Sequence, residues 1–299
     1  FVFTDVNNKI FHLSPLALLA LTACGGGGGG GSSGGGGGSS SGSSSSGGSG
    51  SSGSSSYSIL GKVIKGPLTN ALVFLDYNDN GTFDAGETSV RTASDGSYTL
   101  TSSQASVSIV ALTDDTTIDS SSGSVLTGVT LRAPSGASVV SPNTTLMKEA
   151  GLTAAEVGEV LGLSADIDIT TFNPYATGVD AAKALAVEKV SQQIMTTIST
   201  FAAVTEGSGA SAADSFSTAL ASVVEVVQQK AVAFKSDPSV KLDLSSTTDL
   251  ASIKNSVTTK AASVSGVDQT ALATISNDTA TAIKNVNAKI DTVGGLNQD

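Results

Sequence analysis

The chain has 299 residues, with 15 Lys and Arg against 26 Asp and Glu, so its formal net charge is −11. Nucleic acids and anionic membrane surfaces attract basic patches, so this balance argues against both as partners. Cys24 and His12 are the only cysteine and histidine, which excludes a disulfide framework and argues against zinc sites built on those residues. Aromatic residues make up 4% and Trp is absent, so the core must consist of Val, Leu, Ile and Ala.

The N-terminal segment has the layout of a secretory signal. A short apolar run, "LSPLALLALTAC" (13–24), follows Lys9 and His12 and ends in small residues. Such a run is too short, and has the wrong flanking residues, for a membrane-spanning helix. The sequence therefore predicts a signal peptide over residues 1–23.

The end of this run, Leu21-Thr22-Ala23-Cys24, resembles the lipobox of bacterial lipoproteins. In that family the cysteine becomes the new N-terminus and carries a diacylglyceryl group and a further acyl chain. Several acyl chains anchor a protein stably, whereas one binds a membrane only marginally. The resemblance implies that Cys24 is lipidated and that the protein is anchored in the cell envelope, at the outer membrane or cell surface. The alternative is an ordinary signal peptide that has a cysteine near its end by chance.

A low-complexity segment follows the cysteine, because residues 25–56 are all Gly or Ser. Such a segment cannot bury apolar surface and is expected to behave as a flexible coil. A Gly/Ser coil of this length has a root-mean-square reach of about 30 Å. We therefore expect residues 24–56 to be a lipidated cysteine and a tether that holds a folded body away from the bilayer.

The next segment alternates short β-branched runs with turns. Gly, Pro, Asn and Asp in "GPLTN" (66–70) and "SDGS" (94–97) are typical turn residues. Short strands at this spacing predict a small antiparallel β-sandwich over residues 57–141. The expected strands are 58–64, 71–76, 89–92, 97–101, 107–113 and 125–132.

Residues 61–100 resemble the prealbumin-like modules of bacterial surface proteins. These include B-type modules of serine–aspartate-repeat adhesins, Cna-B-like domains and carboxypeptidase-regulatory-like domains. The resemblance lies in a strand that ends in Phe-Leu-Asp, a D-x-N-x-N-G-x-x-D-x-x-E loop and a following "DGSYTL" strand. Many of the adhesin modules bind calcium in this loop. The chain departs from them in having one module and in having Asn at the third and fifth places of the loop.

The loop "DYNDNGTFDAGE" (76–87) also has ligand spacing that suits Ca²⁺ on chemical grounds. Calcium takes six to eight oxygen ligands, and twelve-residue loops supply them from positions 1, 3, 5, 7, 9 and 12, with Gly at position 6. Phe83 falls where an apolar residue can pin the loop to the core. The alternative is a solvated polar turn, since Asn, Asp and Gly dominate turns. The expected structural Ca²⁺ ligands are Asp76, Asn78, Asn80, Thr82 through its carbonyl, Asp84 and Glu87.

A second acidic stretch, "TDDTTIDSSSG" (113–123), contains Asp114, Asp115 and Asp119. It would suit a second ion site at the same end of the sandwich. A solvated loop is the preferred interpretation.

After "SVVSPNTTL" (138–146) the apolar period changes from two to about three and a half. Thr153 and Glu156 form a capping-box pattern, and Ile283 and Ile290 belong to one apolar stripe. These patterns predict an α-helical bundle of four or five helices over residues 142–299. Its expected helical segments are 153–163, 180–204, 212–234, 248–264 and 268–293.

The residue types argue against an enzyme, although a hydrolase that uses only carboxylates is not excluded. We expect a lipid-anchored envelope protein whose calcium-stabilised body serves in adhesion or surface structure. The alternative is an accessory lipoprotein that binds a surface polysaccharide or another envelope protein. A third possibility is an accessory or substrate-presenting lipoprotein of a secretion or transport system.

Overall fold

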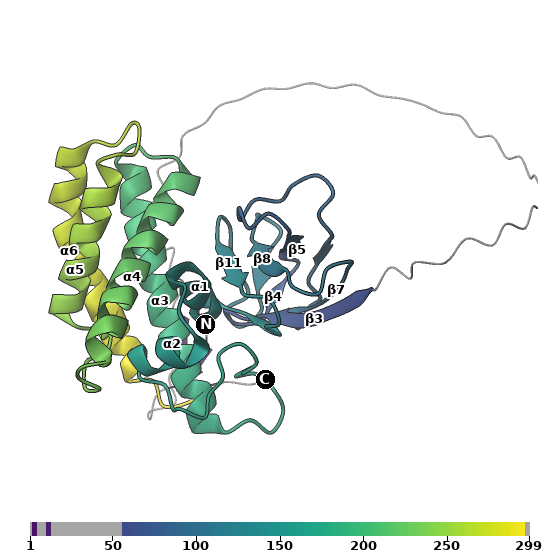
Figure 1. Ribbon diagram of the computed structural model, residues 1–299. Coiled ribbons are helices and arrows are strands. Elements are labelled where there is room, and N and C mark those ends of the chain that lie inside the picture. The colour runs from purple at the N-terminus through teal and green to yellow at the C-terminus, as the bar shows by residue number, and fades with distance from the viewer. Residues whose placement is uncertain (1, 5–9, 13–55, 297–299) are drawn as a thin grey trace, which may run out of the picture.

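The computed structural model describes residues 2–4, 10–12 and 56–296. Residues 57–140 form small, mostly antiparallel β-sheets, and helices follow from residue 142. Figure 1 shows the strands on one side and the long helices on the other, with α1 (Pro142–Ala150) between β11 (Thr130–Ala133) and the rest of the helices. The expected order of a β region followed by a helical region is confirmed.

Three sheets make up the β region. The largest has the strand order β11-β8-β5-β6, the second has the order β12-β3-β7, and the third has the order β10-β9-β4. The remaining strands are β3 (Tyr57–Val63), β4 (Leu68–Thr69), β5 (Leu72–Asp76), β6 (Ser89–Arg91), β7 (Ser97–Ser102), β8 (Ser108–Leu112), β9 (Ile118–Asp119), β10 (Ser124–Val125) and β12 (Val139–Val140).

The strands differ from expectation in three ways. Strand β12 pairs in parallel with β3, so the sheets are not purely antiparallel. The expected strand 125–132 is split into β10 and β11, because Gly128 has a φ of 73° and its N–H binds the Thr113 carbonyl instead of a neighbouring strand. Strands β4, β9 and β12 were not expected, since two residues are too few to show an alternating pattern.

One helix, α1, precedes the first of the expected helical segments, 153–163. Helix α1 starts after Ser141, whose side chain accepts a hydrogen bond from the Thr144 N–H, and Pro142 occupies the first helical position. Thr153 and Glu156 form the expected capping box. The other helices are α2 (Ala154–Val160), α3 (Ala181–Gly207), α4 (Ala212–Phe234), α5 (Thr247–Ala261) and α6 (Gln269–Asp291).

One continuous apolar core joins the β region to the helices. Buried side chains from β5 and β8, such as Leu75 and Ile109, belong to the same contact cluster as Leu146 of α1 and Ile194 of α3. Polar contacts support the junction, because the Thr145 hydroxyl accepts a hydrogen bond from the Arg132 N–H at 2.9 Å. The two regions therefore share buried surface, and α1 fixes their relative placement.

Most of the N-terminal predictions concern residues that the structure does not describe. Strands β1 (Val2–Thr4) and β2 (Ile10–His12) pair in antiparallel fashion. The apolar run 13–24, the lipidation candidate Cys24 and the Gly/Ser segment up to residue 55 lie outside the described residues. No helix in the described ranges combines the length and apolar character needed to cross a bilayer.

Two glycines are predicted to respond oppositely to replacement by alanine. A Cβ on Gly61 would lie 2.4 Å from the Tyr98 hydroxyl oxygen and 2.8 Å from the Ser138 carbonyl oxygen, whereas a Cβ on Gly158 of α2 would meet no atom within 4 Å. We expect Gly61→Ala to lower the free energy of unfolding by about 1–3 kcal/mol, since backbone must shift. Gly158→Ala should raise it by about 0.5–1 kcal/mol. Urea unfolding of both variants checks this, and an unchanged midpoint for Gly61→Ala would contradict the close packing of β3, β7 and β12.

Candidate functional site

The loop between β5 and β6 begins with a buried carboxylate. Strand β5 is paired on both sides, with β8 and β6, so its last residue, Asp76, lies inside the fold with its side chain 0% exposed. Asp76 Oδ1 accepts the Asn80 N–H at 3.1 Å, and Oδ2 accepts the Gly81 N–H at 2.7 Å. The chain therefore turns back around the Asp76 side chain.

Left-handed backbone conformations make this turn tight. Asp79 has a φ of 61° and Gly81 a φ of 75°, conformations that Asp tolerates and Gly adopts freely. Asn78 Oδ1 accepts the Asn80 N–H at 3.2 Å, and Asn80 Oδ1 accepts the Thr82 N–H at 2.7 Å. The first half of the loop is thus held by its own side chains, as Asx residues commonly hold turns.

The second half of the loop closes onto the first. The carboxamides of Asn78 and Asn80 each donate to Asp84 Oδ2 at 2.8 Å, and these bonds hold the pKa of Asp84 below its usual range. Glu87 accepts the Tyr77 N–H at 3.0 Å and the Asp84 N–H at 2.9 Å through its two oxygens. Hydrogen bonds therefore join the side chains at loop positions 3, 5 and 9, and the carboxylates at positions 1 and 12 hold the loop backbone.

Phe83 rests partly on the core. Its ring centroid lies 5.3 Å from that of the buried Phe74, with the planes tilted by 58°. The ring nevertheless stays 42% exposed. The contact expected for this position is present, and it covers only one side of the ring.

A cation from outside the loop holds it to the helical region. Arg132 Nη2 of β11 donates to Asp76 Oδ2 at 3.1 Å and to Asp79 Oδ1 at 3.3 Å, and its Nη1 donates to Glu149 Oε1 of α1 at 2.8 Å. Lys148 of α1 donates to Asp79 Oδ2 at 2.7 Å. Sequence analysis did not identify this network, since Arg132 lies 56 residues from Asp76.

The donor set of the loop suits Ca²⁺ in part. Carboxylate, carboxamide and carbonyl oxygens are ligands that calcium prefers. Asp76 Oδ2 accepts hydrogen bonds from Arg132 and Gly81. Only Oδ1, which accepts the Asn80 N–H, could therefore also face an ion. Within the described ranges, however, no three Asp, Glu, His or Cys side chains gather as a metal-holding group. Calcium would therefore require the carboxamides of Asn78 and Asn80 to turn their oxygens, in place of their nitrogens, toward Asp84.

The second acidic stretch is only in part the solvated loop that was expected. Asp119 on β9 is buried and pairs with Lys65 at 3.1 Å, each side chain being 3% exposed. Asp114 forms an exposed pair with Arg91, while Asp115 is exposed to solvent. The interpretation was wrong for Asp119 because the paired lysine, 54 residues away, cannot be recognised from local composition.

Helix α3 carries a further buried titratable side chain, Glu188. It is fully buried, and burial, reinforced by the nearby Asp119 carboxylate, raises its pKa. Burial also lowers the pKa of Lys65 and raises that of Tyr175 well above its ordinary value. Glu188 was not recognised from the sequence because a glutamate in a regular helical pattern is usually exposed, although Ala184 and Met195, which share its face of α3, are buried.

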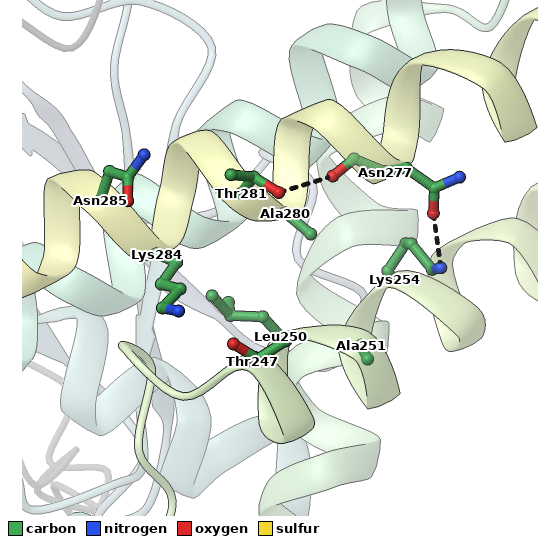
Figure 2. Close-up of a pocket in the computed structure, with 9 residues that line it drawn as sticks. All are labelled: Thr247, Leu250, Ala251, Lys254, Asn277, Ala280, Thr281, Lys284 and Asn285. Atoms are coloured by element: carbon green, nitrogen blue, oxygen red, sulfur yellow. Dashed lines mark hydrogen bonds between the residues drawn. The ribbon is translucent and has the colours of Figure 1, made fainter.

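A shallow groove of about 400 Å³ lies between α5 and α6 (Figure 2). Its lining combines lysine, amide, hydroxyl and aliphatic side chains, and Lys254 Nζ donates to Asn277 Oδ1 at 2.8 Å. Lys284 of α6 faces the same groove (Figure 2). None of the predicted ligand residues lines it. The lining residues are Thr247, Leu250, Ala251, Lys254, Asn277, Ala280, Thr281, Lys284 and Asn285.

Comparison of the chain with protein-family models, with curated proteins and with solved structures found no match.

Arg132 is predicted to be the main support of the loop. Replacement by Met would leave the fully buried Asp76 carboxylate without its guanidinium, and we expect a loss of about 3–5 kcal/mol in the free energy of unfolding. Arg91→Met is the matched control, because its pair with Asp114 is 42% and 39% exposed. That change should cost at most about 1 kcal/mol. Equal midpoints for the two variants in urea unfolding would contradict this assignment.

Proposed function

We propose that the protein is a lipid-anchored component of a bacterial cell envelope whose body is a calcium-stabilised adhesion or surface-structural module. The β region would then be a sandwich of the prealbumin-like kind. One observation supports the proposal: the side chains of Asn78 and Asn80 meet Asp84, and the carboxylates of Asp76 and Glu87 bind backbone N–H groups of the same loop. This is the ligand spacing of a twelve-residue calcium loop.

Calcium would act as a structural ion. Asp76, Asp84 and Glu87 supply three negative charges, and the carboxamides of Asn78 and Asn80 together with the Thr82 carbonyl supply neutral oxygens. Few carboxylates favour weak binding, in the range of extracellular modules that meet millimolar calcium. An ion that binds only the folded loop stabilises the protein by mass action. The loop, and through Arg132 the junction with α1, would therefore be most rigid outside the cell.

The anchor rests on the sequence around Cys24. A short apolar run that ends in Leu-Thr-Ala-Cys, followed by a long Gly/Ser segment, supports lipidation of the cysteine and display of the folded body at a distance from the bilayer. Acyl chains on Cys24 would supply the hydrophobic attachment that no helix of residues 142–296 offers.

Calcium is expected to raise the melting temperature of the chain. At a concentration about tenfold above Kd, mass action adds about 1.4 kcal/mol, which corresponds to a rise in Tm of about 3–6 °C relative to EDTA. Asp84→Asn and Glu87→Gln should each remove most of this rise, because each deletes a charged ligand. These variants are preferable to changes at Asp76, which would also remove one of the carboxylates that Arg132 pairs with.

The matched control for calcium is Asp115→Asn, which makes the same charge change at an exposed aspartate outside the loop. This variant should keep the full calcium-dependent rise in Tm. If calcium leaves the wild-type Tm unchanged, the loop is a polar turn held by Arg132 and the proposed ion site is wrong.

Cys24→Ser is expected to abolish membrane attachment without changing the folded body. Expressed in a lipoprotein-processing bacterium, the wild type should partition into the detergent phase and incorporate labelled palmitate, and the variant should do neither. Calcium-dependent melting should be the same for both proteins. Label incorporation into the serine variant would rule out Cys24 as the attachment site.

A further inference from the structure

The groove between α5 and α6 holds two lysines that no carboxylate neutralises. Nine basic side chains in the described part of the chain form ion pairs with Asp or Glu. Within the same residues, Lys254 of α5 and Lys284 of α6 form no ion pair, and both line this groove. Lys254 Nζ donates to the neutral Asn277 Oδ1 at 2.8 Å, so its charge is held in place without being cancelled.

Acidic side chains of the two helices do not reach the groove. Asp249 and Asp278 are the acidic residues of α5 and α6 that lie closest to the lining residues along the chain, and neither belongs to the lining. Asp249 is buried and pairs with Lys230 at 2.7 Å. The groove is therefore a positively charged site on a protein whose net charge is −11, and an anion is the ligand that complements it.

The two positive charges are set apart by a neutral stretch. Figure 2 shows Lys254 and Lys284 at opposite ends of the groove, with Leu250 and Ala280 between them. The other lining groups include hydroxyls and carboxamides, which both donate and accept hydrogen bonds. The volume of about 400 Å³ lies in the range of small-molecule sites. A matching ligand has two separated negative charges joined by an uncharged part that is rich in hydroxyl groups.

We propose that this groove binds an acidic polysaccharide whose carboxylates lie on separate sugar units. One carboxylate would pair with Lys254 and another with Lys284, while sugar hydroxyls between them meet the side chains of Thr247 and Asn285. A single phosphate group would engage one end of the groove and leave the other lysine without an anion. An extended acidic peptide would have to satisfy its backbone N–H and C=O groups as well, and the walls of two helices offer only side chains for this purpose.

The inference names a ligand for the proposed adhesion role, and it rests on that role for bringing the helices to a surface glycan. The site itself does not depend on calcium, because none of the loop residues 76–87 lines the groove. Since the net charge of the protein repels a polyanion elsewhere on its surface, binding must depend on the two lysines. Binding measured in EDTA therefore tests the groove, whereas calcium-dependent melting tests the loop.

Titration calorimetry with a tetramer of galacturonic acid tests the site. The full chain is used with Cys24→Ser as a common background, and EDTA prevents calcium from bridging carboxylates. The tetramer should bind, and Lys254→Gln and Lys284→Gln should each weaken binding about threefold to fivefold, as expected for the loss of one partly exposed ion pair. The fully methyl-esterified tetramer keeps the sugars and lacks the charges, so it should bind at least about tenfold more weakly.

The matched control is Lys289→Gln, which removes an exposed lysine of the same helix that does not line the groove. This variant should bind the tetramer as the unsubstituted groove does. Lys284→Arg keeps the positive charge and should retain binding, which separates the loss of charge from damage to the fold. Absence of binding by the unsubstituted groove, an equal loss in Lys289→Gln, equal affinity for the ester, or tighter binding of tetraglutamate or inorganic phosphate would each overturn the proposed site.

Discussion

The position of the Arg132 guanidinium is the constraint on which the arrangement of this protein most depends. It meets Asp76 and Asp79 of the loop and Glu149 of α1, and its side chain is only 14% exposed. A carboxylate as buried as that of Asp76 requires a compensating cation. The backbone of the same residue is bound to the Thr145 hydroxyl through both its N–H and its carbonyl. One residue of β11 therefore fixes the loop, the sheet and the first helix relative to one another.

The junction between the β region and the helices combines an apolar core with charge. The network around Arg132 lies where the loop meets α1, and the pair of Lys65 and Asp119 lies inside the β region. Buried ion pairs add little net stability, but breaking one leaves an unpaired charge inside the protein. The pairs of Arg132 with Glu149 and of Lys148 with Asp79 thus penalise alternative placements of α1 more strongly than they strengthen the observed one.

Local sequence patterns predicted the elements that depend on neighbouring residues. The capping box of Thr153 and Glu156 and the turn at 94–97 each act within a few residues, and both appear in the structure. Helix α1 escaped prediction because its third position is Thr144 instead of the usual Glu or Gln. Asn287 is a buried residue of α6 that an apolar stripe does not predict, because its side chain is polar. It is fully buried between Ile283 and Ile290 because its carboxamide reaches Thr197 and the Leu244 carbonyl.

The sequence by itself determined the order of β and helical regions, the turn chemistry of the loop and the spacing of its oxygen-bearing side chains. These features arise from backbone preferences and side-chain contacts within about a dozen residues. Only the tertiary structure decided which charges are buried and what neutralises them. The sequence around Asp119 and Glu188 does not reveal that they are buried, and the sequence around Asp76 does not reveal its pairing with Arg132. The reason is that the environment of a charge is set by groups that folding brings from more than fifty residues away.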